Sequence, residues 1–317
     1  MSERAALLAL LRLGHHWSAC AELVESCGSA RAALERKLLE PSGQASLLAD
    51  VDALVASARA ELDGWERSGW SVLTVVDRGY PTNLRHVHDR PPLIFVAGSL
   101  LPADSRATAV IGSRRASPRG LAAAAEIARA LVADGQTVVS GLAAGVDTAT
   151  HVAALGAGGR TIAVIGTGLA HCYPAQNGAL QARIGSEGAV VSRFWPDDGP
   201  SRRSFPLRNA VMSGLARATV VVEASSTSGA RVQARLALAH GRPVLLWAPL
   251  LAQDWAMELA ERPGVHVVKD PAEVPSVVAR LSAEDALMAG DATGAQDAPA
   301  GIAKGDQALR RDQAPQR

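Results

Sequence analysis

Short apolar runs alternate with helical segments through most of the chain, and this alternation limits the fold more than any other feature. Most of the stretches between the runs carry apolar residues at helical spacing, and several of these stretches end in glycine. Strands that are apolar on both faces and separated by helices form a parallel sheet covered on both sides. The sequence therefore predicts an α/β fold, an extended, Rossmann-like, doubly wound and mostly parallel sheet. The expected strands are 107–111, 137–140, 161–166, 189–192, 218–224, 243–249 and 265–268.

Different compositions flank this alternation. Residues 1–62 carry apolar positions at helical spacing and predict a small helical accessory module. We expect the Rossmann-like core to span 63–287 and to end in a helix over about 271–287. Residues 288–317 are dominated by Gly, Ala, Asp, Gln and Pro, which cannot bury a core, so a disordered tail is expected there.

Several protein classes are excluded by composition. Hydrophobic residues make up 48% of the chain, which is ample for a core, but no uninterrupted run approaches the roughly 20 apolar residues of a membrane span. The N-terminus has no cleavage pattern of a signal peptide. Three cysteines without a CxxC pair indicate neither a disulfide framework nor a structural zinc site. We expect a cytoplasmic protein.

Charge is distributed unevenly although the formal net charge is only +1. The segment 105–250 holds 15 arginines, no lysine and 7 acidic residues, whereas the rest of the chain is acidic overall. Arginine-rich codon usage explains the absence of lysine but not the shortage of acidic residues. The asymmetry predicts an anionic partner for the middle segment.

The loop after the first expected core strand has the features of a phosphate site. It contains Gly112, Ser113, Arg114 and Arg115 and opens a helix. Glycine permits close backbone approach, a helix N-terminus offers unpaired N–H groups, and arginine supplies charge. It is not a GxGxxG fingerprint, so no dinucleotide cofactor is implied. The plainer alternative is a solvated arginine cluster.

Comparable loops follow later strands. Ser140 and Gly141 begin a tight turn whose amides suit an anion. Asn177 is placed to cap a helix or to bond a base or phosphate, and Ser228 with Gly229 opens another helix, where simple capping is again the alternative. No catalytic residue, metal site or cofactor is expected from these loops.

Aromatic residues cluster with arginines between two of these loops. Tyr173, Phe194, Trp195 and Phe205 lie in the same stretch as four arginines, among them Arg208. Aromatic faces stack on unpaired bases, while arginine follows phosphate. This combination indicates binding of single-stranded nucleic acid. The alternative is that the aromatic residues fill the edge of the sheet.

Taken in order, these segments resemble the DprA/Smf family (DNA-processing protein A), with an extended Rossmann fold. The resemblance covers about 70–249 and implies a dimeric protein that binds single-stranded DNA without sequence preference and without catalysis. It also implies protection of strands during natural transformation and loading of the RecA recombinase. The matching segments are GYPTNLRHVHDRPPLIFVAGSL, AVIGSRRASPRG, VVSGLAAGVDTATHVAAL, GGRTIAVIGTGLAHCYPAQNGAL, SFPLRNAVMSGLA and VVVEASSTSGA.

By this resemblance, a DNA pocket is lined by Arg114, Ser140, Gly141, Asn177, Phe205, Arg208 and Asn209. The chain departs from the family pattern at several positions. Ala210 stands where the family has a second arginine, Arg193 replaces an acid, and Ala230–Gln233 replaces the family's S-L-x-T. No winged-helix-like region follows Leu287.

Two other functions compete with this one. A Rossmann-like nucleotide sensor or nucleoside monophosphate phosphoribohydrolase would need an acid–base residue, and Glu223 is the nearby candidate. A protein-interaction scaffold would instead use the N-terminal helices or the tail.

Overall fold

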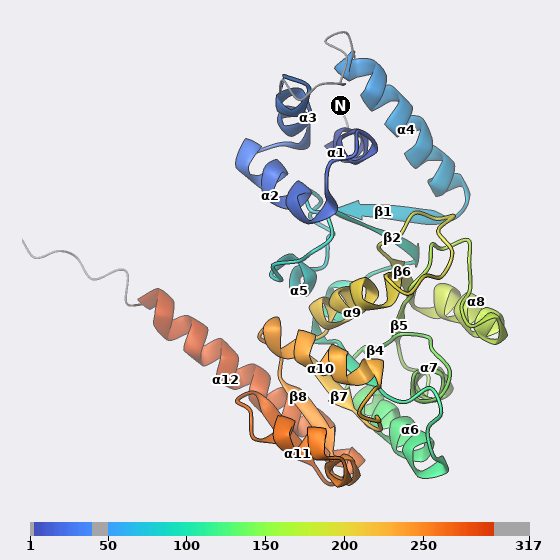
Figure 1. The fold of residues 1–317 in the computed structure, drawn as a ribbon, viewed down its shortest axis with the longest axis vertical. Coiled ribbons are helices and arrows are strands. Elements are labelled where there is room, and N and C mark those ends of the chain that lie inside the picture. The colour runs from blue at the N-terminus through green and yellow to red at the C-terminus, as the bar shows by residue number, and fades with distance from the viewer. Residues whose placement is uncertain (1–2, 40–49, 295–317) are drawn as a thin grey trace, which may run out of the picture. The chain divides into compact units, whose positions relative to one another are not determined.

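The computed structural model describes residues 3–39 and 50–294, so the predicted tail lies outside the described residues from 295 onward. Contacts divide the chain into a large compact unit, Met1–Val278, and a smaller one, Ala279–Arg317 (Figure 1). Among the described helices, none is long and apolar enough to cross a membrane.

One sheet of nine strands runs through the described part of the large unit (Figure 1). Its order is β1-β2-β6-β5-β4-β3-β7-β8-β9, and the strands from β6 to β9 in that order are parallel. β2 pairs antiparallel with both β1 and β6. The predicted Rossmann-like, mostly parallel sheet is confirmed. The strands are β1 (Trp70–Thr74), β2 (Leu93–Gly98), β3 (Thr108–Ile111), β4 (Val138–Ser140), β5 (Thr161–Val164), β6 (Ala189–Ser192), β7 (Ala218–Val221), β8 (Val244–Trp247) and β9 (Val265–Val268).

Burial explains why these strands read as continuous apolar runs. Every residue of β3, β4, β5, β6, β7 and β8 is buried, as expected of parallel strands covered on both faces. Contacts group α6 with α7 and α7 with α8, and separately α9 with α10. The helices are α5 (Thr82–Arg85), α6 (Pro118–Ala133), α7 (Val146–Gly156), α8 (Gly178–Glu187), α9 (Ser204–Leu215), α10 (Gly229–Ala239), α11 (Asp254–Ala260) and α12 (Val274–Gly294).

The N-terminal region is helical, as predicted, and packs against the start of the sheet. α1 lies against α3 and α4, and both α1 and α4 contact β1. The residues of α1 from Ala5 to Leu11 are all buried, so this helix is the core of the group. Asp50 caps α4 by accepting a hydrogen bond from the backbone N–H of Asp52 at 2.8 Å. The four helices are α1 (Glu3–Arg12), α2 (Trp17–Cys27), α3 (Ala30–Leu39) and α4 (Val51–Arg67).

The helix α12 is longer than the sequence predicts, and α9 includes a proline. α9 begins at Ser204 and includes Pro206, because a proline is tolerated in a first helical turn. The last helix, α12, continues to Gly294, past the end expected near Leu287. The start of α9 at Ser204 determines how its arginine is oriented, as described below.

Candidate nucleic-acid interface

The strand order reverses between β3 and β7, whose carboxyl ends lie side by side. Loops that follow such strands diverge and leave a crevice, which is where doubly wound sheets bind ligands. A cavity of about 430 Å³ lies at this point. We call it the switch-point cavity. Among the predicted site residues, those that line it are Gly112, Ser113, Arg114, Arg115, Phe205, Arg208, Asn209, Ser228 and Gly229.

The loop after β3 is held close to the start of α7. A Cβ atom on Gly112 would lie 2.5 Å from Cγ2 of Val146, so the close approach requires glycine. The backbone N–H of Val146 donates to the carbonyl oxygen of Ser113 at 3.2 Å. Arg114 and Arg115 are exposed. The backbone of this turn is therefore fixed, while its two guanidinium groups face solvent at the mouth of the cavity.

Glu223, which follows β7, holds the N-terminus of α6 in place. Ser117 caps α6 by accepting from the N–H of Gly120 at 3.0 Å. Glu223 accepts hydrogen bonds from the N–H of Ser117 at 3.0 Å and from its hydroxyl at 2.6 Å. The Glu223 carboxylate, which the sequence offered as an acid–base candidate, is therefore committed to the N-terminus of α6.

A cation and two aromatic rings meet at the rim of the switch-point cavity. The guanidinium carbon of Arg114 lies 5.0 Å from the centroid of the Phe205 ring. The ring of Tyr173 lies 5.8 Å from that of Phe205, and Tyr173 is 45% exposed. Aromatic faces of this kind stack on bases, and a nearby arginine adds charge for phosphate.

Arg208 forms the floor of the cavity. It is only 6% exposed, and its Nη1 donates to the carbonyl oxygens of Gly141 at 2.5 Å and Val164 at 2.9 Å. Because α9 already begins at Ser204, Arg208 lies within the helix and is directed against the sheet. Arg208 thus lines the cavity, as the resemblance implies, from its buried floor and not from its exposed rim.

Burial shifts the pKa values of the two charged groups at the floor of the cavity, Arg208 and Asp147. It lowers the pKa of Arg208, and the nearby carboxyl group of Asp147 offsets part of that change. Burial raises the pKa of Asp147, which Arg208 opposes. The Nε atom of Arg208 is buried without a hydrogen-bond partner. The floor thus holds a guanidinium with one donor left unpaired.

Three predicted residues lie behind the cavity and do not line it. Ser140 is fully buried, and its hydroxyl donates to the carbonyl oxygen of Val110 at 2.7 Å. Asn177 is also buried and donates through Nδ2 to the carbonyl oxygen of Leu142 and to Oγ1 of Thr148, each at 2.9 Å. Its side chain makes no capping hydrogen bond to α8. These residues, with Gly141, shape the turn that supports the cavity.

The start of α10 forms the opposite wall. Ser228 caps this helix by accepting from the N–H of Ala230 at 3.2 Å. A Cβ atom on Gly229 would meet nothing within 4 Å, so the space in front of this glycine is open. Gln233, one helical turn later, is 1% exposed, and neither its amide oxygen nor its amide nitrogen has a hydrogen-bond partner. A buried amide without hydrogen-bond partners costs folding free energy unless a ligand supplies those partners.

The sequence analysis missed the roles of Gln233 and Asp147 as lining residues and of Tyr173 as the neighbour of Phe205. Gln233 follows Gly229 by four residues, and that spacing on a helix places both on one face. This signal was available. The proximity of Tyr173 and Phe205 depends on how the loop of Tyr173 packs against the start of α9, and local sequence does not encode it.

The aromatic stretch does not act as one surface. Trp195 packs against Trp17 and Trp65 of the N-terminal helices, with ring centroids 5.2 Å and 6.1 Å away. The guanidinium of Arg12 lies 4.0 Å from the Trp195 ring. Arg193 is 5.8 Å from the ring of Trp17. Trp195 therefore packs among the N-terminal helices and Phe95 of β2, while Phe205 lines the cavity.

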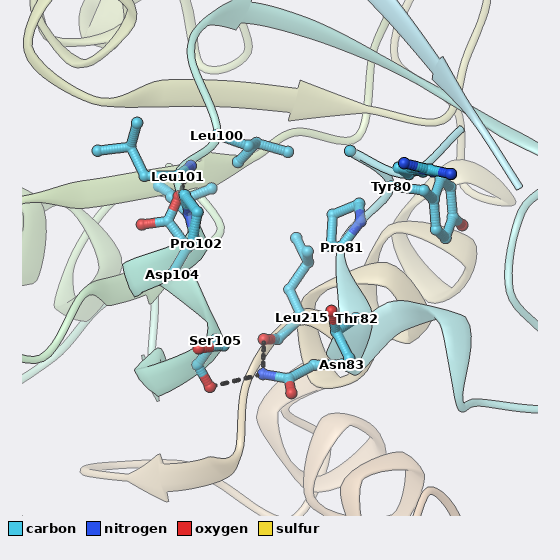
Figure 2. A pocket seen from close by; sticks show the side chains of 13 residues that line it. Tyr80, Pro81, Thr82, Asn83, Leu100, Leu101, Pro102, Asp104, Ser105 and Leu215 are labelled. Carbon is cyan, nitrogen blue, oxygen red and sulfur yellow. Dashed lines mark hydrogen bonds between the residues drawn. The ribbon is translucent and has the colours of Figure 1, made fainter.

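A second cavity of about 290 Å³ lies near the amino ends of the parallel strands (Figure 2). Asn83 donates to the carbonyl oxygens of Ser105 at 2.9 Å and Leu215 at 3.0 Å, drawn as dashed lines in Figure 2. The carboxylate of Asp104 accepts from Arg160 at 2.6 Å and 2.8 Å. These polar groups bond to one another, whereas the switch-point cavity contains unpartnered ones. We therefore place the candidate site at the switch-point cavity.

Comparisons with known proteins agree with this architecture. DNA processing protein DprA of Streptococcus pneumoniae is 40% identical over 171 residues, which are 54% of this chain and 60% of that protein. Protein Smf of Escherichia coli is 41% identical over 166 residues, or 52% and 44% of the two chains. The chain thus spans less than two thirds of the length of these relatives.

Solved structures of DNA processing protein A are also similar to this chain. The crystal structure of DNA processing protein A from S. pneumoniae has a TM-score of 0.61 at 28% identity, covering 87% of this chain and 93% of that one. DNA processing protein A from Helicobacter pylori, described for its single-stranded DNA binding mode, has a TM-score of 0.60 at 26% identity, covering 67% and 96%. The model of the family DNA recombination-mediator protein A matches residues 71–274. The chain therefore belongs to the DNA recombination-mediator protein A family, the DprA/Smf family that its motifs resemble.

Proposed function

We propose that this protein binds single-stranded DNA in the switch-point cavity, by capture of phosphates and stacking of bases. The observation that carries the proposal is the position of the Arg114 guanidinium over the Phe205 ring at the mouth of that cavity. One group neutralises a phosphate while its neighbour offers a face to an unpaired base. Duplex DNA keeps its bases stacked inside and cannot use the ring.

Phosphate capture is supported by the charges around the cavity. Exposed guanidinium groups of Arg114 and Arg115, in the loop that precedes α6, line its mouth. Among the described residues lining the cavity, Asp147 is the acidic one, and burial raises the pKa of its carboxyl group. The N-terminus of α10 also favours an anion.

The residues around the walls of the switch-point cavity support the binding of bases. Tyr173 extends the stacking surface of Phe205 beyond the rim. The open space in front of Gly229 lets a ligand approach the first turn of α10. Gln233 offers an NH₂ group that donates and an amide oxygen that accepts, which match the polar edge of a base or the oxygen atoms of a sugar–phosphate backbone.

The protein acts, in this proposal, by binding and without catalysis. A phosphoribohydrolase would need a carboxylate directed at the ribosyl bond. Glu223 instead accepts hydrogen bonds from both the N–H and the hydroxyl of Ser117. Its bonds favour a structural role, which supports the binding function over the enzymatic alternative.

The biological setting is proposed from the relatives. They are named as DNA processing proteins and the family as a recombination mediator, and the H. pylori protein is described with single-stranded DNA. We place the chain in DNA uptake, natural transformation and homologous recombination, where it protects strands and loads the RecA recombinase. In this proposal it works as a homodimer in the cytoplasm.

The test is a binding titration that compares a fluorescent single-stranded oligonucleotide with its duplex at several salt concentrations. The proposal expects preference for the single strand and an affinity that falls steeply as salt rises, because bound phosphates release counterions. Equal affinity for duplex, or binding insensitive to salt, would contradict it. Incubation with nucleoside monophosphates tests the rival function, since released free base would support an enzyme.

A further inference from the structure

A histidine pair and a carboxylate meet on the large unit, far along α10 from the switch-point cavity. His88 and Asp89 lie in the segment between α5 and β2, and His240 follows the last residue of α10. One ligand atom from each of the three side chains lies within 4.8 Å of the others. His88 is exposed, and the side chain of His240 is fully buried. The cluster therefore has one side open to solvent, at His88, and one side buried in the protein, at His240.

The buried histidine is oriented by a hydroxyl group. Oγ of Ser213 lies 2.7 Å from Nδ1 of His240 and donates to the carbonyl oxygen of Ala210 at 3.3 Å. With its proton directed to Ala210, the hydroxyl oxygen accepts the Nδ1–H of His240. The lone pair of the neutral ring is then on Nε2. A hydrogen-bond partner on the far nitrogen is the usual arrangement for a histidine that binds a metal ion.

That lone pair faces a carboxylate. Nε2 of His240 lies 2.8 Å from Oδ1 of Asp89. Two lone pairs at this distance repel each other unless a cation lies with them. A metal ion bound by both atoms would satisfy the two lone pairs together. The ring of His88, whose centroid is 5.4 Å from that of His240, supplies the third ligand.

We propose that His88, Asp89 and His240 bind a divalent transition-metal ion of the zinc class. Two imidazoles and one carboxylate suit zinc in preference to calcium or magnesium, which take oxygen ligands. The position just past the C-terminus of α10 adds the negative end of the helix dipole. The ion would join α10 to the segment before β2, with water at the open side. The sequence analysis expected no metal site, and this inference departs from it.

The site is separate from the proposed DNA interface. α10 begins at Gly229 beside the switch-point cavity and, with a length of 11 residues, ends at Ala239. At 1.5 Å per residue, these ends are roughly 16 Å apart. Metal binding and oligonucleotide binding can therefore succeed or fail independently.

The experiment is a titration of the chelator-treated full chain with zinc chloride against a chromogenic zinc indicator. The proposal expects one zinc ion per chain. His88→Ala should weaken binding at least about tenfold, because it removes a ligand, and Ser213→Ala should also weaken it about tenfold through the orientation of His240. His86→Ala removes an exposed histidine that is outside the cluster and should bind zinc as the wild type does.

Two results would overturn the proposal. One is wild-type protein that binds no zinc, and the other is His88→Ala binding zinc as well as His86→Ala does. Since His88 is exposed, its variant should fold, which circular dichroism verifies, whereas a variant of the buried His240 is less informative. His88→Ala should also bind a single-stranded oligonucleotide as the wild type does, so failure of the metal site is distinguishable from failure of the proposed function.

Discussion

A Cβ atom on Gly141 would lie 1.8 Å from Nη1 of Arg208, so the guanidinium reaches its two carbonyl acceptors only because residue 141 is glycine. We expect Gly141→Ala to displace Arg208 and leave buried carbonyl groups without a donor. The free energy of unfolding should fall by at least about 2 kcal/mol. Urea denaturation measures this change.

The matched control for that variant is Gly229→Ala. A Cβ there would meet nothing within 4 Å, so the stability should change little beyond the helix preference of alanine. Equal losses of stability in both variants would show that Arg208 does not depend on the space at Gly141.

Arg114 is the exposed cation whose removal should affect DNA binding most directly. Arg114→Ala should weaken binding of a single-stranded oligonucleotide and flatten the slope of log affinity against log salt by about 0.7, the value for one lost phosphate contact. The fold should be unaffected because the side chain is exposed. Fluorescence anisotropy at several salt concentrations measures both effects.

Arg129 offers the control, since it is an exposed arginine further along α6 that does not line the cavity. Arg129→Ala should retain the wild-type salt slope. If both substitutions flatten the slope equally, binding depends on overall charge and not on the switch-point cavity.

Gln233 should show opposite effects on stability and on binding. Gln233→Met keeps the size of the side chain but removes two buried polar atoms that have no partner. The variant should be as stable as the wild type or more stable by about 1 kcal/mol, because an unsatisfied buried group is costly. Its affinity for a single-stranded oligonucleotide should nevertheless fall about tenfold or more. Thermal unfolding and anisotropy on the same sample test this; a loss of stability with unchanged affinity would assign Gln233 to the core.

His151 should make folding stability depend on pH. Burial lowers its pKa to about 3, so the ring stays neutral in the fold, whereas in the unfolded chain it titrates near 6.5. Between these values the unfolded chain binds more protons. Stability therefore falls as pH decreases, by about 1.4 kcal/mol per pH unit from this group.

The comparison that isolates His151 is with His151→Gln, measured by urea denaturation from pH 7 down to about pH 4. The stability advantage of the wild type over the variant should shrink as pH falls. Asp147, whose pKa burial raises, is present in both proteins and cancels in the difference. Parallel stability curves would mean that the pKa of His151 is the same in the folded and unfolded chains.

Local pattern was sufficient to predict the framework of the molecule. Buried parallel strands are mostly apolar, so the runs from 107 to 268 predicted the sheet, and the loops after such strands indicated where the switch-point cavity lies. Gly112 and Ser228 belong to loops from β3 and β7, which the strand order places side by side. These features depend on short-range sequence and on general rules of chain connection.

The side-chain positions could not be predicted in the same way. The burial of Arg208 follows from where α9 begins, and a proline in the segment concealed that start. Trp195 packs against Trp17, which is distant in sequence and belongs to the N-terminal helices. The three ligands proposed for zinc come from two separate segments. Each of these contacts needs the tertiary fold.

The most direct test of the central claim is photocrosslinking of a single-stranded oligonucleotide that carries 5-iodouracil, followed by mass spectrometry of the adduct. Iodouracil couples to aromatic side chains on which the base stacks. Our account predicts adducts on Phe205 or Tyr173, at the rim of the switch-point cavity. Adducts confined to Trp17 and Trp65 in the N-terminal helices, with none on Phe205 or Tyr173, would contradict it.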